Sequence, residues 1–156
     1  MADMKVALKT LIENMYADTD SVSAYYCVSR NEFLMIDYQA RHWVEDQLEV
    51  KDAPEWMREQ ILQAKAIEAA YGKDYYLIPD KYEIDEEGMM KRFAHRINDV
   101  ADSREVMDAL KGREAYRLFR KAITDLGLTD QWHWYRNQCY REIAIEWCQQ
   151  HGLDYV

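Results

Sequence analysis

The sequence contains few residues of the kinds that cross-link or interrupt a chain, with three cysteines, two prolines and five glycines among 156 residues. An odd number of cysteines without a CxxC pair does not indicate a disulfide framework. An apolar N-terminal stretch of the secretory type is also missing. We therefore expect Cys27, Cys139 and Cys148 to be reduced, mostly buried thiols of a cytoplasmic protein.

Long apolar runs and flexible linkers are absent as well. No stretch approaches the roughly 20 consecutive apolar residues that a membrane-spanning helix needs, so we expect no membrane association. Without a Gly/Ser-rich linker, the sequence predicts a single domain over residues 1–156, in which residues 1–80 mix helices with strands and residues 81–156 are helical. A chain of this length can bury a core without metal or disulfide support.

Recognisable catalytic and metal-binding patterns are missing too. The four histidines show neither the spacing of metal ligands nor a pairing with a nucleophile: His42, His95, His133 and His151. Glu142 and Glu146 share a helix face but have no accompanying ExxH motif, so ion pairing is the favoured interpretation. We expect no catalytic residue, no metal and no cofactor.

The charge of the chain is unevenly distributed. The chain carries 20 Lys/Arg against 29 Asp/Glu, a net charge of −9. Residues 1–110 hold 13 basic and 23 acidic residues (−10), whereas residues 111–156 hold 7 and 6 (+1). Because non-specific binding to nucleic acid depends on many cations, this balance argues against a general nucleic-acid coat protein.

Hydrophobic periodicity and helix-capping residues predict an α+β fold that is mostly α-helical, with a helical C-terminal core. Capping boxes at Asp52 and Asp102, and an N-cap at Asp85, begin three of the helices. A short helix is also indicated between residues 43 and 48. The other expected helices cover residues 3–16, 53–71, 86–98, 103–111, 113–126 and 129–150.

Two runs rich in β-branched and aromatic residues, 22–28 and 33–38, predict an antiparallel β-hairpin near the N-terminus. Residues 75–78 can add a third strand, and a three-stranded sheet is the alternative because a lone hairpin is marginal in water.

The last two helices carry apolar residues at spacings of three and four. We expect these faces to meet, so that Phe119 and Ile123 are buried together with Ile143 and Trp147.

Three blocks of the sequence carry a family resemblance: Ile78–Glu86 followed by Met90 and Phe93, then Gly112–Arg120, then Trp132 with Tyr135, Arg136, Arg141–Trp147 and Gly152. They resemble an uncharacterised bacterial protein family, one of the UPF families with no assigned activity. The similarity is strongest from Tyr75 to Gly152. This resemblance implies a shared fold and a cytoplasmic location but no chemistry.

An anion-binding pattern surrounds the helix that follows Gly112. The free N–H groups and the dipole of a helix N-terminus attract anions, and an aromatic ring can stack on a base. The candidate ligand-binding residues are Lys111, Gly112, Arg113, Arg117, Arg120, Lys121 and Trp134. The structural alternative is a helix stop followed by a solvated basic face, because the lysine and hydroxyl of a P-loop are missing.

Glu114 stands in the first turn of this helix, where the resembling family usually has a glycine. A glutamate there can satisfy the helix dipole and also neutralise Arg113 or Arg117, the latter three positions further on. We expect Glu114 to take the place of a ligand phosphate, and phosphate affinity to be weak.

Residues 74–87 form an acidic, tyrosine-bearing segment. A surface of this kind suits a basic partner, and the structural alternative is a solubilising surface with helix-capping residues. The candidate partner-binding residues are Asp74, Tyr75, Asp80, Tyr82, Glu83, Glu86 and Glu87.

The leading functional hypothesis is a non-enzymatic interaction or regulatory protein that binds a protein partner, for example an inhibitor that presents an acidic surface to a basic site. The alternative is a binder of a nucleotide, nucleic acid or other phosphate-bearing ligand through the basic and aromatic residues. A hydrolase with a site assembled from distant residues is a third hypothesis. The partner's identity and the oligomeric state do not follow from the sequence.

Overall fold

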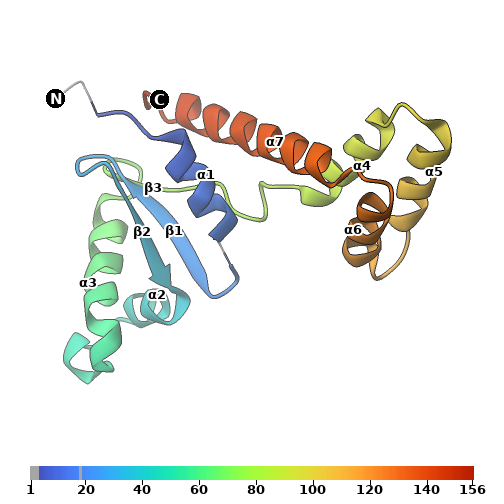
Figure 1. Ribbon diagram of the computed structural model, residues 1–156. Helices are drawn as coiled ribbons and strands as arrows, with labels where there is room; N and C mark the ends of the chain where they lie inside the picture. The colour runs from blue at the N-terminus through green and yellow to red at the C-terminus, as the bar shows by residue number, and fades with distance from the viewer. Residues whose placement is uncertain (1–3, 18) are drawn as a thin grey trace. The chain divides into compact units, whose positions relative to one another are not determined.

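A computed structural model describes residues 4–17 and 19–156. The fold is α+β and mostly α-helical, as the sequence predicted, with a small antiparallel sheet near the N-terminus (Figure 1). The elements follow in the order α1 (Leu8–Ala17), β1 (Val22–Cys27), β2 (Glu32–Asp37), α2 (Tyr38–Glu45), a short 3₁₀ helix (Val50–Asp52), α3 (Glu55–Ala70), β3 (Tyr75–Leu77), α4 (Glu86–Arg96), α5 (Val100–Ala109), α6 (Ala115–Asp125) and α7 (Thr129–Gln150).

The chain packs into two compact units. Unit 1 comprises Met1–Glu83 and Ala144–Val156, and unit 2 comprises Ile84–Ile143. Helix α7 therefore supplies residues to both units. A single domain over residues 1–156 stays a prediction, because compact units of one chain need not fold independently.

The sheet of unit 1 has the strand order β2-β1-β3, with both neighbouring pairs antiparallel. Tyr25 of β1 lies opposite Leu34 of β2 and Leu77 of β3. Because side chains alternate across a strand, these three residues share one face of the sheet, which α2 and α3 cover (Figure 1). On the other face, the ring of Tyr26 packs 5.1 Å from the ring of Phe33.

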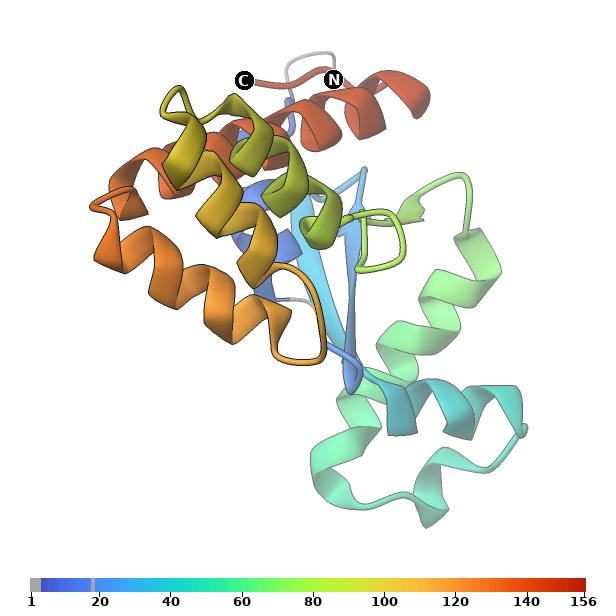
Figure 2. The same ribbon diagram turned by 90° about the vertical axis from the view of Figure 1, so that its right-hand side faces the viewer.

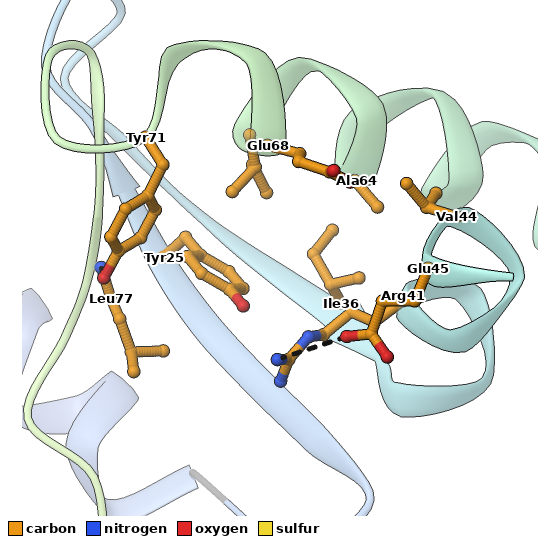
Figure 3. A pocket seen from close by; sticks show the side chains of 10 residues that line it. Tyr25, Ile36, Arg41, Val44, Glu45, Ala64, Glu68, Tyr71 and Leu77 are labelled. Atoms are coloured by element: carbon orange, nitrogen blue, oxygen red, sulfur yellow. Dashed lines mark hydrogen bonds and ion pairs between the residues drawn. The ribbon is translucent and has the colours of Figure 1, made fainter. Parts of the chain in front are cut away.

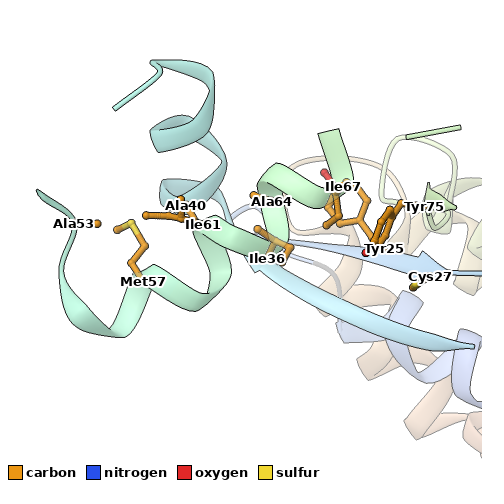
Figure 4. Close-up of a cluster of buried hydrophobic side chains, with 10 residues drawn as sticks. All are labelled: Tyr25, Cys27, Ile36, Ala40, Ala53, Met57, Ile61, Ala64, Ile67 and Tyr75. Atoms are coloured by element: carbon orange, nitrogen blue, oxygen red, sulfur yellow. The ribbon is translucent and has the colours of Figure 1, made fainter. Parts of the chain in front are cut away.

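One hydrophobic core cluster of unit 1 lies between helices α2 and α3 and the face of the sheet that carries Tyr25 (Figure 4). Helix α3 packs against the sheet through apolar residues at spacings of three and four. The apolar faces of the helix and of the strands therefore form one core cluster. The buried residues of this core cluster are Tyr25, Cys27, Ile36, Ala40, Ala53, Met57, Ile61, Ala64, Ile67 and Tyr75.

The connection from β2 to α3 differs from the prediction. Asp37 accepts a 2.8 Å hydrogen bond from the N–H of Gln39 and thereby caps α2, so the helix begins at Tyr38. Asp52 ends the short 3₁₀ helix and does not cap α3. The predicted capping box fails because Pro54 itself occupies the N-cap position and offers no side-chain acceptor.

In unit 2, helices α4, α5 and α6 lie next to one another (Figure 2). Phe93 of α4, Phe119 of α6 and Trp132 of α7 are buried and form an aromatic core. The ring centroids of Phe119 and Trp132 are 4.9 Å apart, and those of Phe93 and Trp132 are 5.5 Å apart, both in edge-to-face geometry. Such geometry is favourable for aromatic pairs.

The helix caps of unit 2 follow the sequence in part. Asp85 caps α4 as predicted, since its carboxylate accepts a 2.9 Å hydrogen bond from the N–H of Gly88. Asp99 caps α5 in place of Asp102, whose N–H donates to the Asp99 carboxylate at 2.9 Å. Helix α5 therefore begins three residues earlier than predicted.

The predicted cluster of the last two helices is wrong with respect to Trp147. Phe119 and Ile123 are buried in unit 2, whereas Trp147 belongs to unit 1. There its ring lies edge-on to that of Tyr26, with the centroids 6.1 Å apart. Helical periodicity correctly predicted a buried face but did not identify what that face packs against.

The first helix also begins later than predicted. Asp3 lies outside the described residues, and the described residues before Leu8 are not helical. Val6 is extended because it pairs with Tyr155 in a parallel bridge, and its N–H donates to the carbonyl of Asp154 at 2.8 Å.

Candidate functional site

Unit 1 contains an open cavity of about 420 Å³ between the sheet and helices α2 and α3 (Figure 3). A volume of this size lies in the range of small-molecule sites, roughly 300–1,000 Å³. All three strands and both helices contribute to the wall of the cavity. The lining residues are Tyr25, Ile36, Arg41, Val44, Glu45, Ala64, Ile67, Glu68, Tyr71 and Leu77.

The floor of this cavity is an extension of the core. Ala64 and Ile67 of α3 belong both to the core and to the cavity wall. The ring of Tyr25 lies edge-on to that of the exposed Tyr71, with the centroids 6.4 Å apart. The hydroxyl of Tyr71 accepts a 3.3 Å hydrogen bond from the N–H of Leu77, which holds this ring at the wall.

Three charged side chains line the same cavity. The guanidinium of Arg41 donates a 2.9 Å hydrogen bond to the hydroxyl of Ser23 and lies 4.0 Å from the carboxylate of Glu45. Glu68 is exposed on α3 and forms no ion pair within the described part of the chain. Since two carboxylates accompany one guanidinium, the cavity is net negative and favours a cation.

The first residues of the predicted acidic segment serve the fold of unit 1. Asp74 accepts hydrogen bonds from the N–H of Ser29 at 2.8 Å and from its hydroxyl at 2.7 Å. These hydrogen bonds hold the pKa of Asp74 below its usual value. Tyr75 is buried in the core, so its predicted place on an exposed acidic surface is wrong. Side chains alternate between the two faces of a strand, and that of Tyr75 points toward α3.

The middle of the segment forms the turn that follows β3. The side chain of Tyr82 is 85% exposed, and its N–H donates a 3.0 Å hydrogen bond to the carboxylate of Asp80. Partial burial, and then the negative charge of Asp80, raise the pKa of Glu83. This turn presents an aromatic ring beside two carboxylates.

The last two acidic candidates belong to unit 2. Glu86 is half-buried and accepts hydrogen bonds from Nε of Arg136 at 2.8 Å and from the hydroxyl of Tyr140 at 2.6 Å. Glu87 forms an exposed ion pair with Lys91 at 3.2 Å. Glu86 therefore connects α4 to α7 within unit 2, and the seven candidate partner-binding residues are divided between the two units.

Most of the predicted cations already have acidic neighbours. Exposed ion pairs join Lys111 to Asp108 at 3.1 Å, Arg117 to Glu114 at 2.6 Å and Lys121 to Asp125 at 2.7 Å. Pairs of this kind contribute little stability, but they reduce the positive charge that a ligand would meet. Arg120 lies over the ring of Tyr116, 5.8 Å from its centroid.

The predicted anion position at α6 is only partly as expected. Gly112 adopts a left-handed φ of 102°, which suits a glycine. Of the two predicted partners of Glu114, Arg113 and Arg117, it is Arg117 that forms the ion pair. Glu114 occupies the N-cap position, but its side chain accepts no hydrogen bond from the helix N–H groups, so its predicted role as an internal phosphate substitute is wrong. The carboxylate turns to the guanidinium instead.

Trp134 has a different setting from the basic residues of α6. It is 63% exposed, and it lines two cavities of unit 2 together with Arg96 and Tyr135. Arg92 lines the smaller of these cavities. Sequence reasoning missed both arginines, although their spacing of four residues on a predicted helix was an available signal.

The thiols are free and buried, as predicted for Cys27, Cys139 and Cys148. Burial raises the pKa of Cys148 to about 11, so this thiol is not a nucleophile at neutral pH. The described residues include no group of three or more His, Cys, Asp or Glu side chains arranged to hold a metal ion. None of the helices in the described part of the chain combines the length and the apolar character that crossing a bilayer requires.

Comparison with curated proteins and with solved structures found no match. A family model does match, over residues 3–156 and therefore over nearly the whole chain. The similarity thus extends into the front half, beyond the blocks from Tyr75 to Gly152 that carried the resemblance. The matching model describes an uncharacterised protein family, UPF0158, and this chain belongs to that family.

Proposed function

We propose that this protein is a non-catalytic binding protein whose unit 1 captures a basic, partly apolar segment of a protein partner. The observation that carries the proposal is the open cavity of about 420 Å³ with an apolar floor and an acidic rim. An apolar side chain of the partner can pack against Ala64 and Ile67. Burial of apolar surface contributes roughly 25 cal/mol per Å² removed from water.

Charge complementarity selects the partner. Glu45 and Glu68 outnumber Arg41 at the cavity, and Arg41 is already engaged by Ser23. A lysine or arginine beside the partner's apolar anchor can pair with Glu68. The net charge of −9 attracts a basic partner over a longer distance and speeds its association. Capture of a basic functional segment would give the protein a regulatory or inhibitory role.

The alternative function, phosphate binding through the basic residues of α6, has less support. Each of three predicted cations already pairs with a carboxylate close by in the sequence: Lys111 with Asp108, Arg117 with Glu114, and Lys121 with Asp125. The exposed Tyr82 lies between Asp80 and Glu83 in the sequence. Exposed tyrosines are frequent anchors of protein interfaces, and the two carboxylates favour a basic partner.

A random peptide library displayed on phage tests the proposal, because it offers basic, acidic and apolar segments to the protein side by side. We expect selection on the purified protein to enrich peptides that place a lysine or arginine next to a large apolar residue. Binding of the strongest peptide, followed by fluorescence anisotropy, should weaken roughly ten-fold or more in Glu68→Lys. Ala64→Met, which fills the cavity, should weaken it as well.

Two matched controls lie on the same helix outside the cavity. Glu59→Lys makes the same charge change and Ala66→Met the same enlargement at exposed positions, and both should bind the peptide as the unchanged protein does. Enrichment of acidic peptides, an equal loss in Glu59→Lys and Glu68→Lys, or a library that yields no binder would each refute the proposal.

A further inference from the structure

We infer that unit 2 carries a second ligand site, which takes a phosphate group attached to a planar aromatic ring system, as in a mononucleotide. The site lies between α4 and the first half of α7, where two adjoining cavities of about 360 and 470 Å³ share Arg96, Trp134 and Tyr135 in their walls. All of its residues belong to unit 2, so the inference is independent of partner binding by unit 1.

Two guanidinium groups supply the charge. Arg92 and Arg96 are four residues apart on α4, so they project from the same face of the helix. Neither forms an ion pair with a carboxylate in the described ranges, 4–17 and 19–156, in contrast to Lys111, Arg117 and Lys121 of the predicted basic surface. This pair of arginines is therefore better suited to bind an anion than those three cations.

The geometry of Arg96 leaves its hydrogen-bond donors available. Its guanidinium lies over the ring of Tyr135, 5.1 Å from the centroid. A cation–π contact of this kind engages the charge of the guanidinium and leaves its N–H groups able to donate hydrogen bonds. A planar fork held in this way matches two oxygens of a phosphate group.

Arg92 lines the smaller cavity together with the same aromatic residue. The interaction with Tyr135 raises the pKa of Arg92, while partial burial acts in the opposite direction. The smaller cavity contains both guanidiniums against one carboxylate, that of Glu142, and therefore has a net charge of +1. We assign this cavity to the phosphate.

The larger cavity suits the aromatic ring. Its wall includes the apolar side chains of Phe93 and Ile97, and Trp134 stands between the two cavities because it lines both. The indole of Trp134 is 63% exposed, so a flat surface is available for stacking. Nucleobases of every kind stack on such surfaces.

Isothermal titration with adenosine monophosphate, adenosine and inorganic phosphate tests the inference. We expect the mononucleotide to bind, and adenosine and inorganic phosphate each to bind at least roughly ten-fold more weakly, because each occupies only one cavity. Arg92→Gln, Arg96→Gln and Trp134→Ala should each lower affinity for the mononucleotide roughly ten-fold or more. Arg96→Lys keeps the charge but loses the fork, and should show an intermediate loss.

Arg104→Gln is the matched control, since Arg104 is an arginine of the same unit that lines neither cavity. It should leave affinity unchanged within about two-fold. Circular dichroism confirms that each variant is folded. The inference is overturned if no mononucleotide binds at millimolar concentration, or if Arg104→Gln weakens binding as much as Arg96→Gln. A loss in Arg117→Gln without a loss in Arg92→Gln would place the site on α6 and overturn it as well.

Discussion

The indole N–H of Trp147 donates a 3.0 Å hydrogen bond to the backbone carbonyl of Leu77, which lies 70 residues earlier in the chain. This bond joins the last turns of α7 to strand β3 within unit 1. The indole also meets Tyr26 on the face of the sheet opposite α3. Trp147 therefore satisfies a backbone acceptor and fills the core at the same time, a combination that suits the large apolar ring and single N–H donor of tryptophan.

We predict that Trp147→Phe destabilises the protein by about 1–3 kcal/mol, because the Leu77 carbonyl then loses its donor. Chemical denaturation followed by circular dichroism measures the change. Trp56→Phe is the control, since Trp56 is exposed and its substitution should have little effect. An equal effect of the two substitutions would show that the hydrogen bond is not responsible.

Phe119→Ala should cost roughly 3–5 kcal/mol, as a large-to-small change in a packed core. The Phe119 side chain is fully buried in unit 2 against Phe93 and Trp132. Tyr116→Ala on the same helix removes an exposed ring and should cost much less. The melting temperature of both variants provides the comparison, and an unchanged value for Phe119→Ala would contradict the packing of this core.

His151 makes stability depend on pH. Burial lowers the pKa of His151, whose ring lies 4.3 Å from that of Tyr76 and 5.1 Å from that of Trp147. The unfolded chain then binds the proton more readily than the folded one. The contribution of His151 to stability is therefore complete above the unfolded pKa of about 6.5 and is lost as the pH falls toward the lower folded pKa.

His151→Gln should accordingly flatten the dependence of the free energy of unfolding on pH between about pH 7 and pH 5. Urea denaturation at several pH values measures this slope. His133→Gln, at an exposed position of α7, is the control and should leave the slope as it is. An unaltered slope in His151→Gln would mean that another group governs stability in this range.

Glu114→Gly tests the turn at Gly112. Because Glu114 stands at the N-cap position and not inside α6, glycine should cost only a few tenths of a kcal/mol. Loss of the ion pair releases Arg117, and we expect affinity for inorganic phosphate to rise several-fold. Phosphate binding is measured by phosphorus NMR titration. The Arg96→Gln substitution is present in every variant, so that binding at the two cavities lined by Trp134 does not obscure binding at this turn. Strong phosphate binding at this turn before the mutation would contradict the prediction.

The helices that local signals define were predicted well. Helix α7 begins and ends where the sequence indicated, and α3 and α6 agree within about two residues. Gly127 and Gly152 adopt left-handed φ values of 70° and 65° after α6 and α7, a conformation that glycine accepts without strain. Periodicity and helix stops act within a few residues, so the sequence alone determines them.

The placement of individual side chains required the tertiary structure. The sequence shows an acidic segment, but the pairing of β3 with β1 decides that Tyr75 is buried and that Asp74 binds Ser29. Arg92 and Trp134 of the proposed second site are 42 positions apart in the numbering, and the packing of α4 against α7 brings them to one cavity. Sequence patterns determined which faces are apolar or charged. Only the long-range contacts decided which faces meet, because a helical or strand period specifies a direction of burial and not a partner.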